Sequence, residues 1–216
     1  MENIFINTHS SIKIVINDLN FYFDPFMINE DKKDADFILI THDHYDHFDI
    51  KSIKRIINQN TTIVYPKSIS SVVKKEISNL VFRDEILVKQ SDKYEFTLKN
   101  DKFSVVSIPA YNLNKNFHKK EFGYIGYILE INETKYYVAG DTDVIDENKN
   151  IKCDIMFIPI GGTYTMDYIE AAKYVNSVNP KKVIPTHYGS VVGDKEDFNK
   201  FKKEVDSSIE VVEKIF

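Results

Sequence analysis

The residues best suited to chemistry lie in one stretch, Thr41-His42-Asp43-His44-Tyr45-Asp46-His47, which holds three of the six histidines of the chain. Neutral imidazole and carboxylate are the ligands that borderline and hard divalent cations prefer. Alternate side chains point the same way in an extended segment, so we expect His42 and His44 to serve one ion and Asp46 and His47 an adjacent one. The alternative is a solvated polar loop, which the desolvation cost of clustered imidazoles disfavours.

Three short apolar runs end in candidate ligands and are predicted to be the strands that position them. Phe37–Thr41 leads into the histidine cluster, Tyr136–Ala139 leads into Gly140 and Asp141, and Val183–Thr186 leads into His187. Side chains at the ends of buried strands are held by a rigid scaffold, as a site for chemistry requires. The three runs therefore predict one cleft lined by histidines and aspartates.

These motifs and their order resemble the metallo-β-lactamase fold superfamily over nearly the whole chain. The matching segments are His-x-His-x-Asp-His at 42–47, Ala-Gly-Asp-Thr-Asp at 139–143 and Ile-Pro-Thr-His-Tyr-Gly at 184–189. The branch that the chain resembles most contains ascorbate-6-phosphate lactonase and N-acyl-phosphatidylethanolamine phospholipase D. The resemblance implies an α+β fold, an αββα four-layer sandwich of two mixed β-sheets, forming a single domain over residues 1–216.

The resemblance also implies a centre of two divalent metal ions, Zn²⁺ or Mn²⁺. In it Asp141 bridges the ions and His187 completes the second site. The superfamily supplies another histidine to the first ion, in this branch from a Pro-Ala-x-His segment, but here that segment reads Pro109-Ala110-Tyr111-Asn112. An Asn carbonyl oxygen suits Mn²⁺ or Mg²⁺ better than Zn²⁺. His118 lies six residues on, and we favour His118 over Asn112 as the ligand.

Two such ions would hold a water and bring its pKa to roughly 7, so that metal-bound hydroxide is available at neutral pH. Asp46 is the expected catalytic residue, because it can ligate a metal and orient this hydroxide. Further residues beside the motifs are expected to contact the substrate: His9, Tyr164, Thr165 and Tyr188. Cys153 is interpreted as a packing residue with no neighbouring base.

We expect a metal-dependent hydrolase of an ester, lactone or phosphodiester bond in a small anionic metabolite. Gly161-Gly162-Thr163-Tyr164-Thr165 opens a helix, whose N-terminus would suit an anion, and Lys115, Lys119 and Lys120 add positive charge nearby. An ordinary strand-to-helix turn with Thr165 as N-cap is the alternative for this loop. A nucleic-acid phosphodiesterase and a non-catalytic metal- or ligand-binding domain are the alternative functions.

Composition narrows the class of protein. The 216 residues carry a net charge of −5, which argues against a general nucleic-acid surface. Cys153 is the only cysteine, so no intramolecular disulfide is possible. No signal peptide and no apolar run of the ~20 residues that span a bilayer is evident, so we expect a cytoplasmic protein without a membrane partner. A homo-oligomer is compatible with the sequence.

Hydrophobic periodicity predicts alternating strands and helices around the motifs. Strands are expected at 3–7, 12–17, 21–23, 62–65, 85–89, 94–98, 102–108, 123–131, 135–139, 154–160, 182–185 and 209–212. Helices are expected after Asp49 as an N-cap, at 70–78, at 166–177, and after Asp194 as an N-cap. Such interspersed elements are typical of mixed α and β proteins.

Overall fold

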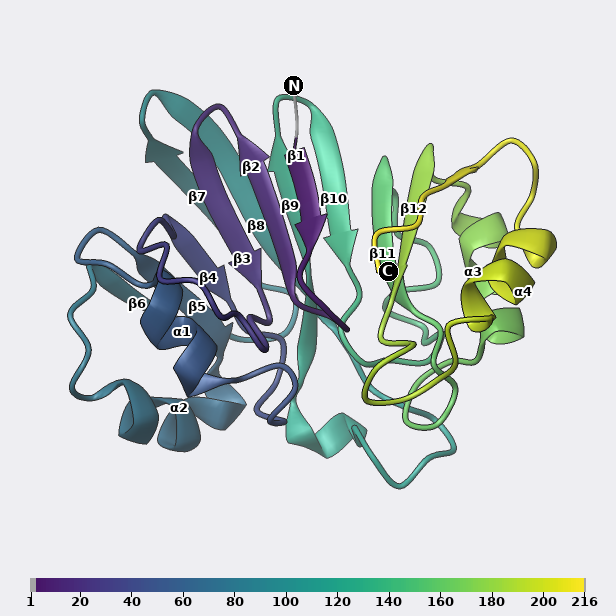
Figure 1. Cartoon of the computed structure of the whole chain (residues 1–216), viewed down its shortest axis with the longest axis horizontal. Coiled ribbons are helices and arrows are strands. Elements are labelled where there is room, and N and C mark those ends of the chain that lie inside the picture. Colours follow the sequence, from purple (N-terminus) through teal and green to yellow (C-terminus); the bar gives the residue numbers. More distant parts are fainter. Residues whose placement is uncertain (1–2, 216) are drawn as a thin grey trace. The chain divides into compact units, whose positions relative to one another are not determined.

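The computed structural model describes residues 3–215, and contacts within the chain divide it into two compact units, residues up to 89 and residues from 90 onward. Each unit is built on one mixed β-sheet with helices (Figure 1). The α+β class and the two mixed sheets are therefore confirmed. Among the described residues, the helices are all too short or too polar to cross a membrane.

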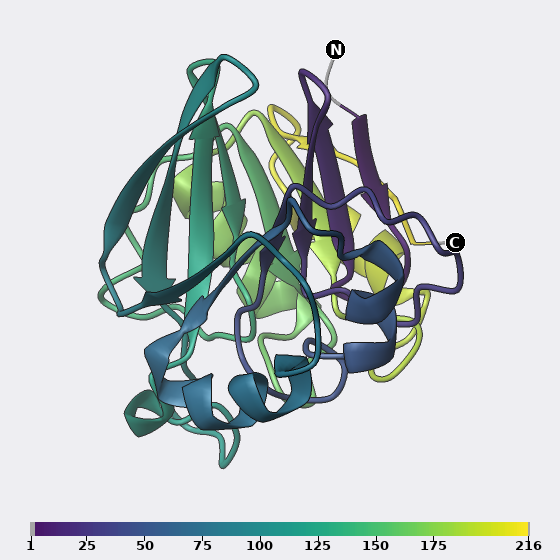
Figure 2. The ribbon, with the colours of Figure 1, turned by 90° about the vertical axis from the view of Figure 1, so that its left-hand side faces the viewer.

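The first unit contains a six-stranded sheet in the order β1-β2-β3-β4-β5-β6. Strands β1 to β3 form an antiparallel meander, and β3 to β6 pair in parallel (Figure 2). The elements are β1 (Asn3–Ile6), β2 (Ile12–Ile16), β3 (Leu19–Phe23), β4 (Phe37–Leu39), α1 (Ile50–Ile56), β5 (Thr62–Pro66), η1 (Lys67–Ile69), α2 (Ser70–Ile77) and β6 (Asp84–Val88).

Strand β4, which leads to the histidine cluster, is apolar and buried along its whole length, as is its neighbour β5. A continuous apolar run suits a parallel strand that is covered on both faces. After the cluster, Asp49 begins α1 as predicted, because its side chain accepts from the backbone N–H of Lys51. The cluster is thus fixed between a buried strand and a capped helix.

The second unit contains a seven-stranded sheet in the order β13-β12-β11-β10-β9-β8-β7. Strands β7 to β10 pair antiparallel, and β10 to β13 pair in parallel. The elements are β7 (Lys93–Leu98), β8 (Asp101–Pro109), η2 (Lys120–Phe122), β9 (Ile125–Ile131), β10 (Thr134–Val138), β11 (Ile155–Pro159), α3 (Tyr168–Val178), β12 (Lys182–Thr186), α4 (Asp197–Glu204) and β13 (Glu210–Val211).

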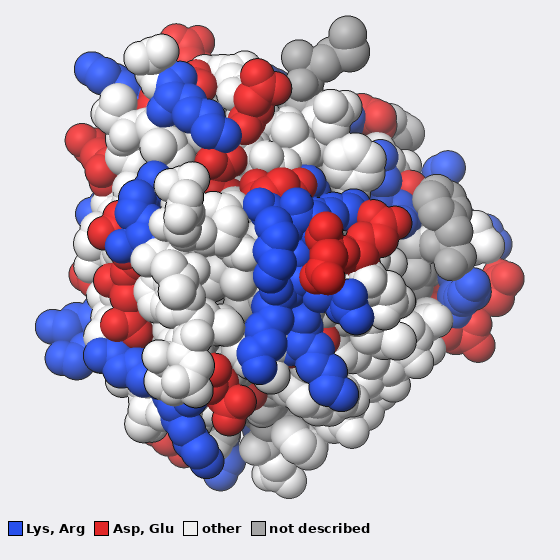
Figure 3. Space-filling model, turned by 60° about the vertical axis from the view of Figure 1, so that its left-hand side comes forward, with Lys and Arg blue, Asp and Glu red and all other residues white. Residues whose placement is uncertain are grey.

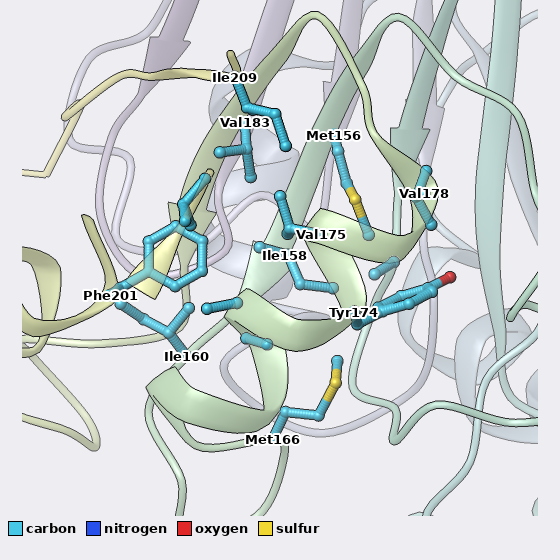
Figure 4. Packing of buried hydrophobic residues seen from close by; sticks show 14 of the residues in the cluster. Met156, Ile158, Ile160, Met166, Tyr174, Val175, Val178, Val183, Phe201 and Ile209 are labelled. Atoms are coloured by element: carbon cyan, nitrogen blue, oxygen red, sulfur yellow. The ribbon is translucent and has the colours of Figure 1, made fainter. Parts of the chain in front are cut away.

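The core of the second unit lies between its parallel strands and the helices α3 and α4. Val175 of α3 and Phe201 of α4 are fully buried in this cluster together with Ile158 of β11 (Figure 4). Because β10, β11 and β12 run in parallel, the segments that follow β10 and β12 emerge at the same edge of the sheet. These segments carry Asp141 and His187.

Two helix starts differ from the sequence prediction. Helix α3 begins after Asp167, which accepts from the N–H groups of Ile169 and Glu170 and forms a capping box with Glu170; Thr165 is not the N-cap. Helix α4 begins after Glu196, and Asp194 lies two residues earlier, where its side chain accepts from the N–H of Glu196. In α3 an acidic residue closer to the helix accepts from the first N–H groups, whereas Glu196 at the start of α4 makes no capping hydrogen bond with its side chain.

We predict that Phe201→Ala destabilises the protein by about 3–5 kcal/mol, because it removes a fully buried ring and leaves a cavity. Ile169→Ala is the matched control, because Ile169 lies on α3 of the same unit but is 39% exposed. Urea unfolding monitored by circular dichroism gives both values. Equal losses in the two variants would contradict this description of the core.

Candidate metal centre

The histidine cluster forms a turn rather than an extended segment. The N–H groups of His47 and Phe48 both donate to the carbonyl of His44, at 3.0 and 2.8 Å. The ring centroid of His42 lies 4.7 Å from that of His44 and 4.0 Å from that of His47. The expected alternation of side chains along a strand is therefore wrong, since the turn itself brings the three rings together.

Asp24 is a buried carboxylate that the sequence did not single out, and it accepts hydrogen bonds from two residues of this cluster. It follows β3 and accepts three hydrogen bonds: from the N–H of Thr41 at 2.8 Å, from the hydroxyl of Thr41 at 2.7 Å and from Nδ1 of His47 at 2.7 Å. Complete burial raises the pKa of Asp24, and these donors oppose the rise because they favour the ionised form.

These hydrogen bonds decide where the protons of two histidines lie. When Asp24 is ionised it only accepts, so Nδ1 of His47 then carries the proton and Nε2 carries the lone pair. The Thr41 hydroxyl donates its proton to Asp24, so its oxygen accepts from Nδ1 of His42 at 2.9 Å. His42 is therefore also protonated on Nδ1. Both imidazoles are therefore arranged to bind a cation through Nε2. Histidine ligands in known metal sites are oriented in the same way when a carboxylate accepts from their other ring nitrogen.

His9, expected to contact substrate, lies against the catalytic candidate Asp46. Its Nε2 is 3.1 Å from Oδ2 of Asp46, and both side chains are buried. The candidate ligand atoms of His9, Asp46 and His47 all lie within 4.8 Å of one another. His9 therefore holds one carboxylate oxygen of Asp46 in place.

In the second unit, Asp141, His187 and His118 converge. Oδ2 of Asp141 lies 3.0 Å from Nε2 of His187 and 3.3 Å from Nε2 of His118, and all three side chains are buried. Asn112, the alternative to His118, is buried as well, and its side-chain nitrogen lies 3.3 Å from Nδ1 of His118. Sequence spacing alone did not show that these two alternatives are in contact.

The remaining substrate candidates lie in different surroundings. The carbonyl of Tyr164 accepts from the Asn112 side chain at 2.7 Å, and its ring packs edge-on against Phe117. Thr165 is fully buried. Tyr188 lies within the apolar core cluster of the second unit, where burial raises the pKa of its hydroxyl.

Several of these residues have a left-handed backbone, which is costly for any residue except glycine. The φ angle is +54° at His9, +46° at Asp24, +53° at His118 and +57° at His187. A glycine makes room for the last of these: a Cβ at Gly161 would lie 2.2 Å from the carbonyl oxygen of His187. Strain at four residues that bear imidazole or carboxylate is typical of a functional site.

The charges that were expected to attract an anion are largely paired. Lys115 forms an ion pair with Asp143, and Lys120 lies 2.9 Å from a carboxylate oxygen of Glu147. The capping box of Asp167 occupies the N–H groups at the start of α3. The N–H groups of Ile169 and Glu170 therefore already have an acceptor within the chain, and the N-cap of α3 is Asp167 and not Thr165.

Comparisons with known proteins identify the family of the chain. Residues 3–187 match the model of the beta-lactamase superfamily domain. A UPF0173 metal-dependent hydrolase of Pyrococcus horikoshii is 30% identical over 203 residues, which cover 88% of this chain and 86% of that protein. A protein of Parabacteroides distasonis proposed to be a metal-dependent hydrolase is 28% identical, with a TM-score of 0.80 over 100% of this chain and 94% of that one.

The fold alone is shared with a metallo hydrolase of Ignicoccus hospitalis. That structure is 19% identical, and it has a TM-score of 0.76 over 100% of this chain and 94% of its own.

We predict that Asp24→Asn weakens binding of Zn²⁺ by about 10- to 100-fold, because an amide cannot accept from all three donors and no longer fixes the protons of His42 and His47. Competition with a chromogenic chelator measures the affinity. Asp49→Asn is the control: Asp49 is a helix cap in the same unit, and Asn caps helices equally well. An affinity unchanged in Asp24→Asn would contradict the assigned role.

Proposed function

The chain belongs to the beta-lactamase superfamily and is a metal-dependent hydrolase, and we propose that it hydrolyses an ester, lactone or phosphodiester bond in a small anionic metabolite. The family match over 3–187 runs through both compact units, which supports the proposal that residues 1–216 act as one domain. The observation that carries the proposal is the convergence of imidazole nitrogens on the Asp141 carboxylate.

The donors in the second unit fit a cation. The Nδ1 atom of His118 lies 3.3 Å from the carbonyl oxygen of Tyr164, which only accepts, so its proton belongs on Nδ1. The lone pair on Nε2 then faces Oδ2 of Asp141 at 3.3 Å. Two electron-rich atoms at this distance need a proton or a cation between them. The combination of imidazole and carboxylate suits Zn²⁺ or Mn²⁺.

We assign the ligands from the resemblance of the motifs together with these local contacts. Two divalent ions would be held by His42, His44, Asp46, His47, Asp141 and His187, with His118 in place of the expected third histidine. When bound, such ions lower the pKa of water to roughly 7 and polarise the oxygen under attack.

The side chains of the protein then orient the reactants. His9 holds Asp46 through Oδ2, and Asp46 would orient the attacking water. Asp24 and Thr41 keep the protons of His42 and His47 on the nitrogens that face away from a cation. The aromatic pair Phe117 and Tyr164 lies beside His118 and can contact the part of the substrate that does not react.

The anionic substrate follows mainly from the charge of two divalent ions and from the resemblance to a lactonase of a sugar-acid phosphate. Lys119 is exposed beside His118 and adds positive charge. Nucleic acid is less suitable as substrate, because basic side chains on the face in Figure 3 lie beside acidic ones. In the first unit, for example, Lys13 pairs with Asp34 and Arg83 with Asp84.

We predict that the purified protein holds divalent metal and that Asp141→Asn loses most of it, because the amide neutralises the carboxylate on which two imidazoles converge. Inductively coupled plasma mass spectrometry gives the metal content per chain. Cys153→Ser is the matched control: burial raises the pKa of the Cys153 thiol to about 12, so this thiol is neither a ligand nor a nucleophile at neutral pH. Equal metal content in Asp141→Asn and wild type would contradict the assignment.

We predict that hydrolysis favours anionic substrates over neutral ones. Phosphorylated lactones, cyclic phosphodiesters, neutral lactones and β-lactams would be compared in the presence of Mn²⁺ and of Zn²⁺. Wild type and Cys153→Ser should act equally, and inorganic phosphate should inhibit both. A preference for neutral compounds that added phosphate does not affect would show that the substrate class is wrong, and an inactive Cys153→Ser variant would contradict activation of water by metal.

A further inference from the structure

Asn112 closes the loop that carries His118. Its backbone N–H donates to the carbonyl of His118 at 2.8 Å, and its side-chain Nδ2 donates to the carbonyl of Phe117 at 3.0 Å. The same Nδ2 donates to the carbonyl of Tyr164 at 2.7 Å, which ties the loop to the segment before α3. One buried side chain therefore joins both ends of the loop to a second segment of the unit.

These contacts fix the orientation of the amide. Both side-chain partners are carbonyl oxygens, which only accept, so a flipped amide would place Oδ1 against two oxygens. An amide nitrogen has two protons, and the two carbonyls take both. Asn112 consequently has no proton left to donate to Nδ1 of His118, although these two nitrogens are only 3.3 Å apart.

Asn112 also holds the carbonyl that sets the tautomer of His118, since its Nδ2 donates to the carbonyl of Tyr164. Nδ1 of His118 lies 3.3 Å from the carbonyl of Tyr164, which only accepts, so Nδ1 carries its own proton and donates it to that carbonyl. The lone pair of His118 is thereby directed through Nε2 toward Asp141. The same loop holds His118 at a φ angle of +53°, which a non-glycine residue adopts only when its surroundings enforce it.

We propose that Asn112 is a positioning residue, which aims the Nε2 lone pair of His118 at the metal and is not itself a ligand. The proposal rests on the proposed function in one respect, the assignment of His118 as a metal ligand. The opposing assignment would use Oδ1 of Asn112, which is buried and has no hydrogen-bond partner among residues 3–215. The two assignments predict opposite responses to one substitution.

That substitution is Asn112→Asp, which keeps the shape of the side chain. A carboxylate has no proton for the carbonyls of Phe117 and Tyr164, so a positioning role predicts a loop that opens and a metal affinity that falls by about 10- to 100-fold. A carboxylate is also a stronger ligand than an amide, so direct ligation predicts a higher affinity. Asn112→Ala removes both functions and is expected to lose affinity in either case.

The experiment combines two measurements on the whole protein, with Asn116→Ala as the control, since Asn116 is an exposed asparagine of the same loop. The ¹⁵N shifts of the His118 ring, assigned with His118→Ala, report which ring nitrogen carries the proton in Zn²⁺-loaded protein. Competition with a chromogenic chelator gives the affinity for Zn²⁺ and for Mn²⁺. Thermal unfolding of each variant verifies that it is folded.

The expected result is a proton on Nδ1 in wild type and Asn116→Ala, loss of that single tautomer in Asn112→Ala, and weaker metal binding by Asn112→Asp and Asn112→Ala. An unchanged tautomer in Asn112→Ala, or binding by Asn112→Asp at least as tight as in wild type, would overturn the proposal. If wild type bound no metal, the proposed function itself would fail; if wild type bound metal and Asn112→Asp bound it at least as tightly, only the positioning role would fail.

Discussion

The candidate centre depends on one constraint: each imidazole must keep its proton on the nitrogen that faces away from the cation. In the first unit, the buried carboxylate of Asp24 meets this constraint for His47 directly and for His42 through Thr41. In the second unit, the carbonyl of Tyr164 meets the same constraint for His118, because it accepts from Nδ1 of that ring. The two units thus reach the same proton arrangement with a charged acceptor in one case and a neutral acceptor in the other.

This arrangement has a cost in backbone conformation and in desolvation. His9, Asp24, His118 and His187 have positive φ angles, and Asp24 is fully buried. Strained or desolvated residues of this kind persist only where the surrounding structure holds them in place. Here that surrounding structure consists of capped helices and buried parallel strands. The rigid core of β11, β12, α3 and α4 therefore supports the strained segment at His187.

The sequence predicted most of the strands, because apolar runs between polar turns leave few alternatives, and the ligands at the ends of three of these strands remain predictions. It did not predict the role of Asp24, since a lone Asp-Pro pair after a strand indicates only a turn; the signal was that this strand leads into the same sheet as the cluster. It also did not predict the start of α3, because Asp167 rather than Thr165 accepts from the first N–H groups of the helix and forms a capping box with Glu170. A contact between residues distant in sequence accounts for the first difference, and a local capping box accounts for the second.

The central claim is that the proton positions of the imidazoles are set in advance for binding through Nε2. A crystal structure of the Zn²⁺-loaded protein, with the ions located by anomalous scattering, tests it most directly. The account predicts that the zinc ions contact Nε2 of His42, His47 and His118, while Nδ1 of each ring keeps its contact with Thr41, Asp24 and Tyr164 respectively. Zinc bound to Nδ1 of any of these rings would contradict the account.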